Sequence, residues 1–488
     1  MKVLLINPPY TYQTPWLQIT EPLGILYLAA YLRSYSSHNI GVVDCLDNHS
    51  IHKIGKRLYW YGLTHVEMIK KISEFVPDVV GVTCMFSKKK NDFLGCLRVI
   101  KSHFPAIKII VGGTYPSLFP EEVVHTGLVD YCVIGEGETS FHRLLNILDN
   151  KENGSLLDLD GIAFLNNGNL VLNPKLDYIE NLDHIPFPAR DLINYEAYIT
   201  RKSVLHGLGL RRSASILTSR SCPNRCNFCS MYRIHGPRWR GRSAANVIDE
   251  ILHLVREFGI QDLFVMDDNF TFKRDRIVAI CDGIIQAGLR IRWNTPNGIS
   301  INTLDYELLN LMKKSGCKSI CIAIETGDEE LRNKVIGKRL SNSKIKEVVH
   351  SAANLGIFIT AFYIIGMPGE TRDKFAKTLQ QIVSLPLNGV AAAFANPLPG
   401  TKLYQDCIEN NWCLLENSSD DNHNILYKPF IVTNDFSEEE LIKREKAFYR
   451  TFMRAKIFTI IKDTLLMRNL LIYPPFLMRV VKDRLLRH

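Results

Sequence analysis

The first 150 residues alternate short apolar runs, rich in β-branched residues, with longer stretches of helical periodicity. This alternation is typical of a parallel sheet whose strands are joined by crossover helices. The pattern therefore predicts a doubly wound α/β domain over residues 1–150. Its predicted strands are Val3–Ile6, Asn39–Asp44, Val79–Thr83, Ile107–Val111 and Tyr131–Ile134.

The last three of these strands run directly into small or polar residues. The loops begin Thr83-Cys84-Met85, Gly112-Gly113-Thr114 and Gly135-Glu136-Gly137. In doubly wound sheets, ligands bind beyond the carboxyl ends of the strands, where glycine lets a ligand approach the backbone closely. We therefore expect a binding site along this edge. None of the loops reads G-x-G-x-x-G, so a dinucleotide is not the favoured ligand.

A second alternating pattern occupies residues 213–435, after a mixed segment, 151–212, that we expect to be a connector. Six successive strand and helix units predict a partial (β/α)6 barrel. Its predicted strands are Ser215–Thr218, Asp262–Met266, Arg290–Asn294, Ser319–Ile324, Phe358–Ile365 and Val390–Ala395. The predicted helices between them are Ala244–Phe258, Asp275–Ala287, Leu304–Ser315, Asn342–Leu355 and Thr371–Ser384.

The last part of the chain, residues 436–488, is predicted to be a basic amphipathic helical region. Residues 441–488 hold twelve Lys and Arg against three Asp and Glu, which accounts for the entire net charge of +9. Because apolar residues are interleaved with the basic ones, this region either packs its apolar side on the body of the protein or lies on a membrane surface. The net positive charge lies in this C-terminal region and not near the clustered cysteines described below, so we expect no nucleic-acid partner.

No apolar run approaches the ~18 residues of a membrane-spanning helix, and the N-terminus has no signal-peptide pattern, so we expect a cytoplasmic protein. Nine of the twelve cysteines are dispersed and are expected to be small buried hydrophobes. The other three, Cys222, Cys226 and Cys229, form a C-x3-C-x2-C cluster after the first barrel strand. A structural zinc site would need a fourth ligand, for which His235 is the nearest candidate, whereas a 4Fe-4S cluster with three protein ligands leaves one iron open to substrate.

This loop resembles the cluster loop of radical S-adenosylmethionine (SAM) enzymes, and the glycine-edged N-terminal domain is similar to the Rossmann-like cobalamin-binding domain of one subclass. The resemblance covers roughly residues 1–435. It implies that Cys222, Cys226 and Cys229 ligate a 4Fe-4S cluster and that Phe228 lies near the adenine of SAM. An electron from the cluster would then cleave SAM to a 5′-deoxyadenosyl radical.

Four further segments at successive barrel strand ends resemble SAM-binding motifs of the family. Asp267-Asp268 follows the second strand, Ile324-Glu325-Thr326-Gly327 the fourth, Gly366-Met367-Pro368-Gly369-Glu370-Thr371 the fifth and Asn396-Pro397-Leu398-Pro399-Gly400-Thr401 the sixth. The residues that the resemblance places near SAM are Phe228, Asp267, Asp268, Glu325, Gly366, Pro368, Gly369, Glu370 and Pro399.

In the N-terminal domain, Asn7-Pro8-Pro9-Tyr10 stands where many cobalamin-binding domains carry a cobalt-ligating histidine, so a histidine-ligated corrin is not expected. The resemblance nevertheless implies cobalamin as a second cofactor. The residues that match cobalamin-lining loops are Thr83, Gly112, Gly113, Thr114, Gly135, Glu136 and Gly137.

The function that the resemblance favours is methylation of an unactivated carbon of a small-molecule or lipid substrate. The alternative within the family is a radical cyclase or ring-rearranging enzyme without net methyl transfer. An alternative of another class is a non-catalytic cobalamin sensor or carrier, although a sensor needs no cluster with an open iron. An enzyme of this kind needs an electron donor such as a flavodoxin or ferredoxin.

Overall fold

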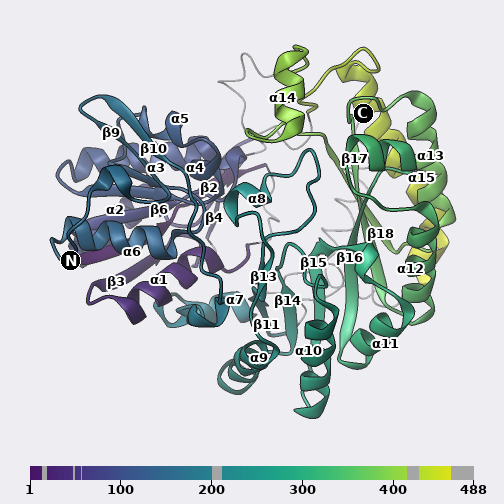
Figure 1. Cartoon of the computed structure of the whole chain (residues 1–488), viewed down its shortest axis with the longest axis horizontal. Helices are drawn as coiled ribbons and strands as arrows, with labels where there is room; N and C mark the ends of the chain where they lie inside the picture. The colour runs from purple at the N-terminus through teal and green to yellow at the C-terminus, as the bar shows by residue number, and fades with distance from the viewer. Residues whose placement is uncertain (14–18, 48–49, 57, 201–210, 415–427, 463–488) are drawn as a thin grey trace. The chain divides into compact units, whose positions relative to one another are not determined.

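The computed structural model describes residues 1–488 apart from 14–18, 48–49, 57, 201–210, 415–427 and 463–488 (Figure 1). The described chain forms two compact units, the first from residues 1–200 and 230–242, and the second from 211–229, 243–414 and 428–462. The chain therefore enters the second unit, returns to the first directly after Cys229, and leaves it again after Arg242.

The first unit is built on a seven-stranded sheet of order β10-β9-β8-β7-β6-β1-β3. Five neighbouring strands run parallel with the first strand of the chain inside the sheet, which confirms the predicted doubly wound domain. These strands are β1 (Lys2–Asn7), β3 (Asn39–Asp44), β6 (Val79–Thr83), β7 (Lys108–Gly112) and β8 (Tyr131–Val133).

Helices cover both faces of this sheet. They are α1 (Leu23–Tyr35), α2 (His65–Phe75), α3 (Lys90–His103), α4 (Thr114–Leu118), α5 (Pro120–Val124) and α6 (Gly137–Leu148). Because side chains alternate along a strand, Leu4 and Ile6 of β1 pack in the core formed with α2 and α3, whereas Val3 and Leu5 pack in the core formed with α1 and α6. Each such side chain contributes about 1.5–3 kcal/mol by leaving water.

The expected connector contributes structure of its own. Two strands, β9 (Ile162–Asn166) and β10 (Asn169–Asn173), form a hairpin that extends the sheet antiparallel to β8. A separate antiparallel sheet, not predicted from the sequence, comprises β2 (Tyr10–Tyr12), β4 (Ile51–Gly55) and β5 (Leu58–Tyr61). The first unit also contains α7 (Tyr195–Thr200), α8 (Met231–Ile234) and β13 (Arg240–Gly241).

The second unit contains six parallel strands in sequence order, with β11 and β18 at the two edges of its described part. This arrangement confirms the predicted open sheet of strand and helix units. The strands are β11 (Ser213–Ile216), β14 (Asp262–Val265), β15 (Arg292–Ile299), β16 (Cys317–Glu325), β17 (Phe358–Ile365) and β18 (Gly389–Phe394), and a short strand, β12 (Ser219–Arg220), follows β11.

The described part of this unit has seven α-helices, five of which begin at a side-chain cap. They are α9 (Ala244–Phe258), α10 (Arg274–Gln286), α11 (Tyr306–Lys314), α12 (Asn342–Asn354), α13 (Arg372–Ser384), α14 (Lys402–Glu409) and α15 (Glu438–Lys462). An oxygen in the capping side chain accepts a hydrogen bond from the amide three residues on, which satisfies an otherwise unpaired donor. Such caps are Ser243, Asp305, Ser341, Thr371 and Thr401.

The described part of the basic tail is the long helix α15, which packs against α13 and β17. Its Phe448 is buried, with its ring centroid 5.3 Å from that of Tyr363 in β17. The apolar side of this part of the tail therefore packs on the second unit, and the tail beyond Lys462 lies outside the described residues. No described helix is both long and apolar enough to cross a lipid bilayer.

Candidate functional site

The three clustered cysteines lie on one loop that follows β11 and β12. All three are half-buried free thiols, and the Cys229 amide donates to the Cys226 carbonyl at 3.0 Å. Ser221, directly before the first cysteine, has a φ of 69°, a left-handed conformation that costs a non-glycine residue about 1–3 kcal/mol. Such strain persists where the surrounding structure fixes the backbone. The conformation of Ser221 sets the direction in which the loop leaves β12.

The middle of the loop is anchored to the segment that follows β16 and to α14. The Asn227 amide donates to the Ile336 carbonyl at 3.0 Å, and the Asn227 carbonyl accepts from the Leu403 amide at 2.9 Å. Cys226 and Phe228 pack against a buried apolar cluster that contains Leu331, Ile336, Met367, Ala395, Leu403, Cys407 and Ile431. The loop is therefore seated in a water-poor pocket made by several loops of the second unit.

The surroundings of the cysteines suit a negatively charged metal cluster. Burial raises the pKa of Cys226 to about 12 and also raises the pKa of Cys222. Lys338 opposes both shifts, whereas the carboxylate of Glu325 adds to the first and that of Asp268 to the second. The Asn269 Nδ2 donates to the Cys222 Sγ at 3.6 Å. Metal binding requires deprotonated thiols, and a nearby cation and an amide donor stabilise thiolates. Three thiols on one loop match the ligand number of a cluster with an open iron.

His235, the candidate fourth ligand of a zinc site, is engaged by a carboxylate. It belongs to the first unit, where its Nδ1 lies 3.1 Å from Glu136 Oε1. Among the described residues, no three His, Cys, Asp or Glu side chains lie close enough together to hold one metal ion. This holds for Cys222, Cys226 and Cys229 as well, so the described side-chain positions assemble neither a zinc site nor a cluster site, and the choice between the two rests on ligand number.

Asp267, at the end of β14, is buried and fixes the start of the cysteine loop. Its carboxylate accepts hydrogen bonds from the Thr218 amide and hydroxyl, both at 2.6 Å, and from the Ser219 hydroxyl at 2.5 Å. Its neighbour Asp268 is half-buried. The residue expected near SAM thus also determines where the cluster loop begins, a role that motif comparison did not indicate.

Glu325, at the end of β16, forms a buried ion pair with Lys338. The Lys338 Nζ donates to Glu325 Oε1 at 2.5 Å, and each side chain is less than a tenth exposed. Glu325 has a φ of 69°, so its backbone is also in the left-handed region. Sequence reasoning missed Lys338, because nothing in the surrounding Ile336-Gly337-Lys338-Arg339 distinguishes it from a solvated lysine.

The turn after β17 carries Gly366, Pro368, Gly369 and Glu370. Glu370 is fully buried, and its Oε2 accepts from the Gly366 amide at 2.9 Å, which closes the turn. Burial raises the pKa of Glu370 to about 7, although the Gly366 amide and Arg444 favour its charged form. The other oxygen, Oε1, has no hydrogen-bond partner among the described residues.

Arg444 of α15 holds this turn from the outside. Its Nη1 donates to the Glu370 carbonyl at 2.8 Å and to Glu370 Oε2 at 3.1 Å, and its guanidinium lies 5.5 Å from the ring centroids of Phe375 and Phe436. Sequence reasoning missed Arg444 because it is one of twelve basic residues in a region with no assigned chemistry. The tail therefore reaches a motif that we expect to bind SAM.

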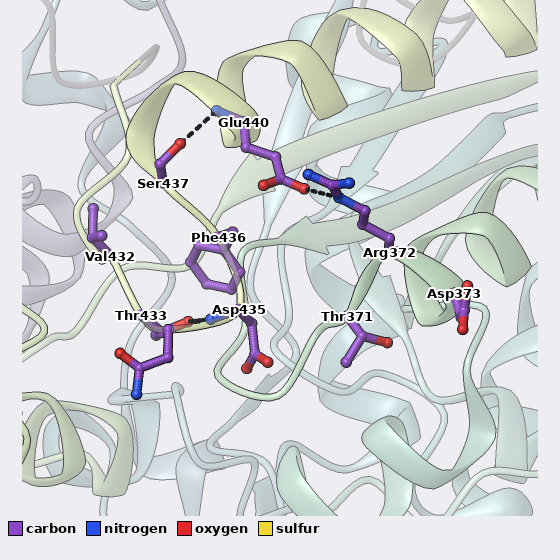
Figure 2. Close-up of a pocket in the computed structure, with 10 residues that line it drawn as sticks. Thr371, Arg372, Asp373, Val432, Thr433, Asp435, Phe436, Ser437 and Glu440 are labelled. Carbon is purple, nitrogen blue, oxygen red and sulfur yellow. Dashed lines mark hydrogen bonds and ion pairs between the residues drawn. The ribbon is translucent and has the colours of Figure 1, made fainter.

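An open cavity of about 590 Å³ lies beside this turn, lined by Thr371, Arg372, Asp373, residues 432–437 and Glu440. Figure 2 shows Arg372 turned toward Glu440, whose Oε1 lies 3.0 Å from Arg372 Nε. The Gly369 amide donates to Asp435 Oδ2 at 3.1 Å. Residues before and within α15 thus contact the second half of the turn and the first residue of α13. At the end of β18, Pro399 is half-buried.

The cobalamin-lining candidates gather at the carboxyl ends of β6, β7 and β8 in the first unit. The Gly135 amide, after β8, donates to the hydroxyl of Ser117 in α4 at 2.8 Å, which ties the β7 and β8 loops together. Gly113 has a φ of 99°, and a side-chain carbon there would lie 2.8 Å from the Cys84 carbonyl. These loops present Thr83, Gly112, Gly113, Thr114, Gly135 and Gly137 as half-buried positions.

Large apolar side chains stand exposed at the same edge. Met85 and Phe86, which follow β6, are 50% and 54% exposed. Nearby, Lys89 lies 4.3 Å from the ring centroid of Tyr10, an arrangement that the sequence did not indicate. Exposed apolar groups beside glycine-containing loops fit a flat macrocycle such as a corrin, because that ligand buries a wide apolar face.

Glu136 differs from its neighbours in this set. It is buried, and both carboxylate oxygens are engaged by residues that follow the cysteine loop in sequence, namely His235 and Arg240. The structure thus gives this side chain protein partners within the first unit.

Comparison with known proteins agrees with both units. Residues 16–145 match the model of the B12 binding domain, and residues 216–382 match that of the Radical SAM superfamily. The chain belongs to the cobalamin-dependent radical SAM enzymes. The two domains imply a 4Fe-4S cluster, SAM and cobalamin as cofactors, and enzymes of this kind need an electron donor and a substrate.

Relatives of this radical SAM enzyme carry out different reactions. It is 28% identical to the cytidylyl-2-hydroxyethylphosphonate methyltransferase of Streptomyces wedmorensis, over 92% of this chain and 90% of the relative. It is 24% identical to the anaerobic magnesium-protoporphyrin IX monomethyl ester cyclase of Rubrivivax gelatinosus, over 94% of this chain and 78% of the relative. The solved radical SAM methyltransferase TsrM of Kitasatospora setae has the same fold, with a TM-score of 0.67 and 20% identity over 84% of this chain and 76% of that one.

Proposed function

We propose that this enzyme methylates an unactivated carbon of a small-molecule or lipid substrate. The observation that carries the proposal is the combination, in one chain, of a cobalamin-binding unit with a three-cysteine cluster loop. When bound, the cluster supplies the electron that cleaves SAM, and cobalamin supplies a carrier for the methyl group. Methyl transfer explains why both cofactors are needed. A relative of almost the same length is named as a methyltransferase, which supports this proposal.

The chain's own residues would hold the cofactors and keep water away. Cys222, Cys226 and Cys229 would ligate the cluster. The buried apolar residues that Cys226 packs against would exclude water from that side of the cluster. Lys338, paired with Glu325, provides positive charge next to the thiolates. In this proposal, Phe228, Asp268 and Pro399 line the SAM site directly.

Two other residues would act on the SAM site through the backbone. Asp267 fixes the origin of the cluster loop through Thr218 and Ser219, and Glu370 closes the turn that begins at Gly366. Thr83, Gly112, Gly113, Thr114, Gly135 and Gly137 would lie against cobalamin in the first unit.

A radical cyclase or ring-rearranging enzyme is the second candidate. The observation that favours it is the similarity, over most of the chain, to an anaerobic cyclase. Both candidates use the same cluster and radical, so the residues described above do not separate them. A non-catalytic cobalamin sensor is less well supported, because such a protein would not need three free thiols on one loop, with Cys226 packed against a buried apolar cluster.

We further propose that the enzyme works in the cytoplasm and takes its electron from a flavodoxin or ferredoxin. A lipid substrate would be consistent with peripheral membrane contact by the basic tail. In the described part of that tail, Phe448 and Phe452 are buried on the second unit, so these two side chains are not available to a membrane.

The decisive experiment is anaerobic reconstitution with iron, sulfide and cobalamin, followed by reductant, cell extract and SAM with a deuterated methyl group. Methylation predicts a product that carries the deuterated methyl group, formed together with S-adenosylhomocysteine and 5′-deoxyadenosine. An altered but unlabelled product, formed with 5′-deoxyadenosine alone, would replace the methyltransferase by the cyclase. If the fully loaded protein forms neither S-adenosylhomocysteine nor 5′-deoxyadenosine, the result would favour the sensor.

A further inference from the structure

Glu136 and Arg240 form a buried, two-pronged ion pair within the first unit. Arg240 Nη2 donates to Glu136 Oε1 at 2.6 Å, and Nη1 donates to Oε2 at 3.0 Å. Each side chain is only 4% exposed. A planar guanidinium that meets a carboxylate through two parallel hydrogen bonds has little freedom to rotate, so this contact fixes orientation as well as distance.

The remaining contacts of Arg240 hold its guanidinium on every side. Nη1 also donates to the Ile179 carbonyl and Nη2 to the His235 carbonyl, both at 2.7 Å, and the guanidinium lies 5.2 Å from the ring centroid of Tyr178. Arg240 therefore ties three backbone segments together: the β8 loop through Glu136, the former connector through Ile179, and its own segment through His235. Removing the Glu136 charge would leave the Arg240 guanidinium buried without its carboxylate.

A second contact fixes the same two segments against each other. A side-chain carbon at Gly135 would lie 3.0 Å from the Ile234 carbonyl, so the β8 loop and the end of α8 are in direct backbone contact. Gly135 also has a φ of 72°, a backbone conformation that residues with a side chain rarely adopt. The loop that carries Gly135 and Glu136 is thus shaped to receive residues 230–242, in addition to any cofactor at the strand ends.

These contacts bear on the cluster because of the chain's path. Residue 230 is covalently joined to Cys229, the third thiol of the cluster loop, and from there to Arg242 the chain belongs to the first unit. The Cys229 amide in turn donates to the Cys226 carbonyl. A displacement of residue 230 on the first unit would therefore act directly on its covalent neighbour, Cys229.

We propose that Glu136 and Arg240 are a positioning pair that holds the cluster loop through its downstream segment, so that the loop after β8 controls cluster geometry. This inference rests on the cofactors that the family implies and deepens the proposed function, but it does not depend on whether the reaction is a methylation. A buried carboxylate at a cobalamin-side strand end thereby acts on the iron–sulfur site.

The test compares Glu136→Gln and Arg240→Lys with a matched control, Glu21→Gln. Glu21 also forms an ion pair inside the first unit, with Arg190 at 3.3 Å, and both of those side chains are equally buried. It therefore controls for the general cost of losing a buried charge pair. In the apo protein, the measurement is hydrogen exchange of peptides covering residues 222–242. After reconstitution, the iron and corrin contents and the rate of 5′-deoxyadenosine formation are measured. The electron paramagnetic resonance spectrum of the reduced cluster is recorded with and without SAM.

We expect Glu136→Gln and Arg240→Lys to exchange faster over residues 222–242, to show an altered cluster spectrum, and to form 5′-deoxyadenosine about 10²-fold more slowly, because a displacement of order 1 Å can have that effect. Corrin content should equal that of the wild type. The double variant should be no slower than the slower single variant, because the two residues act as one pair. If Glu136→Gln does not fold, Arg240→Lys gives the same comparison. This variant keeps the positive charge but loses the pair of parallel hydrogen bonds to the carboxylate.

Two results would overturn the proposal. Variants that behave like Glu21→Gln in exchange and spectrum would show that the pair only adds stability. Loss of corrin with an unchanged cluster spectrum and unchanged 5′-deoxyadenosine formation would make Glu136 a cobalamin-lining residue, as its motif first indicated. Because none of these readouts follows methyl transfer, failure of the methylation proposal would leave the test intact.

Discussion

Lys338 Nζ lies 2.5 Å from Glu325 Oε1, and both side chains are buried beside Cys226. We expect Lys338→Met to leave the Glu325 carboxylate buried without its cation, at a cost of about 3–5 kcal/mol in the free energy of unfolding. Thermal unfolding of the apo protein should show this loss, and reconstitution should incorporate less iron. The control is Lys334→Met, which breaks an exposed pair with Glu330 in the helical turn just before Lys338 and should leave both measurements unchanged.

Cys226→Ala should abolish 5′-deoxyadenosine formation and lower the iron content, because two thiolates cannot hold the cluster. Cobalamin binding should persist, since the cobalamin-lining candidates belong to the first unit. Cys413→Ala, at another half-buried thiol of the second unit, is the control. Unchanged nucleoside formation in Cys226→Ala would contradict the assignment of the cluster loop.

The carboxyl of Glu370 should make stability depend on pH. Burial raises its pKa to about 7 from an ordinary value of 4.5, so between these values the folded protein binds more protons than the unfolded chain. The free energy of unfolding should therefore fall as pH rises from about 4.5 to 7, by an amount of order 3 kcal/mol. Chemical denaturation at several pH values should show this slope in the wild type and a smaller one in Glu370→Gln. Equal slopes would exclude Glu370 as the source.

Gly113→Ala should weaken cobalamin binding and destabilise the first unit. At a φ of 99°, an added carbon would lie 2.8 Å from the Cys84 carbonyl, so the β7 loop would have to shift. Gly127→Ala is the matched control, because Gly127 also has a positive φ, 67°, but its added carbon would meet open space. Equilibrium titration with hydroxocobalamin should separate the two variants; equal affinities would remove Gly113 from the cobalamin-lining set.

Truncation after Lys462 tests the proposed membrane contact without disturbing α15. If the tail binds membranes, the full chain should cosediment with anionic liposomes and the truncated chain should not, because basic residues near an anionic surface contribute about 1 kcal/mol each. High salt should weaken that binding. Equal cosedimentation of both chains would remove the support for membrane contact by this region.

The sequence predicted the strands and the cysteine loop because their signals are local. The runs Val79–Thr83 and Phe358–Ile365, for example, coincide with β6 and β17. The hairpin β9–β10 was not predicted as strands, because its short runs carry little periodic signal.

The partners of the buried carboxylates could not be predicted, because each pairing joins residues far apart in the chain. The sequence assigned Glu136 to a ligand-binding loop, but in the structure it pairs with Arg240. The sequence assigned Glu370 to a SAM-binding motif, but in the structure it pairs with Arg444. In both cases the motif located the carboxylate, but only folding determined which of many arginines would reach it. The SAM and cobalamin assignments of individual residues remain predictions.

The return of residues 230–242 to the first unit also constrains how the protein is made. During synthesis, Glu136 emerges long before Arg240, so the carboxylate must stay hydrated, and the β8 loop unfinished, until the chain has been extended through the cluster loop. The N-terminal unit therefore cannot complete its packing as an independent cotranslational domain. A gene fragment that ends at the first boundary would encode a unit without its last pieces, and the two cofactor-binding parts would have to be inherited and exchanged together.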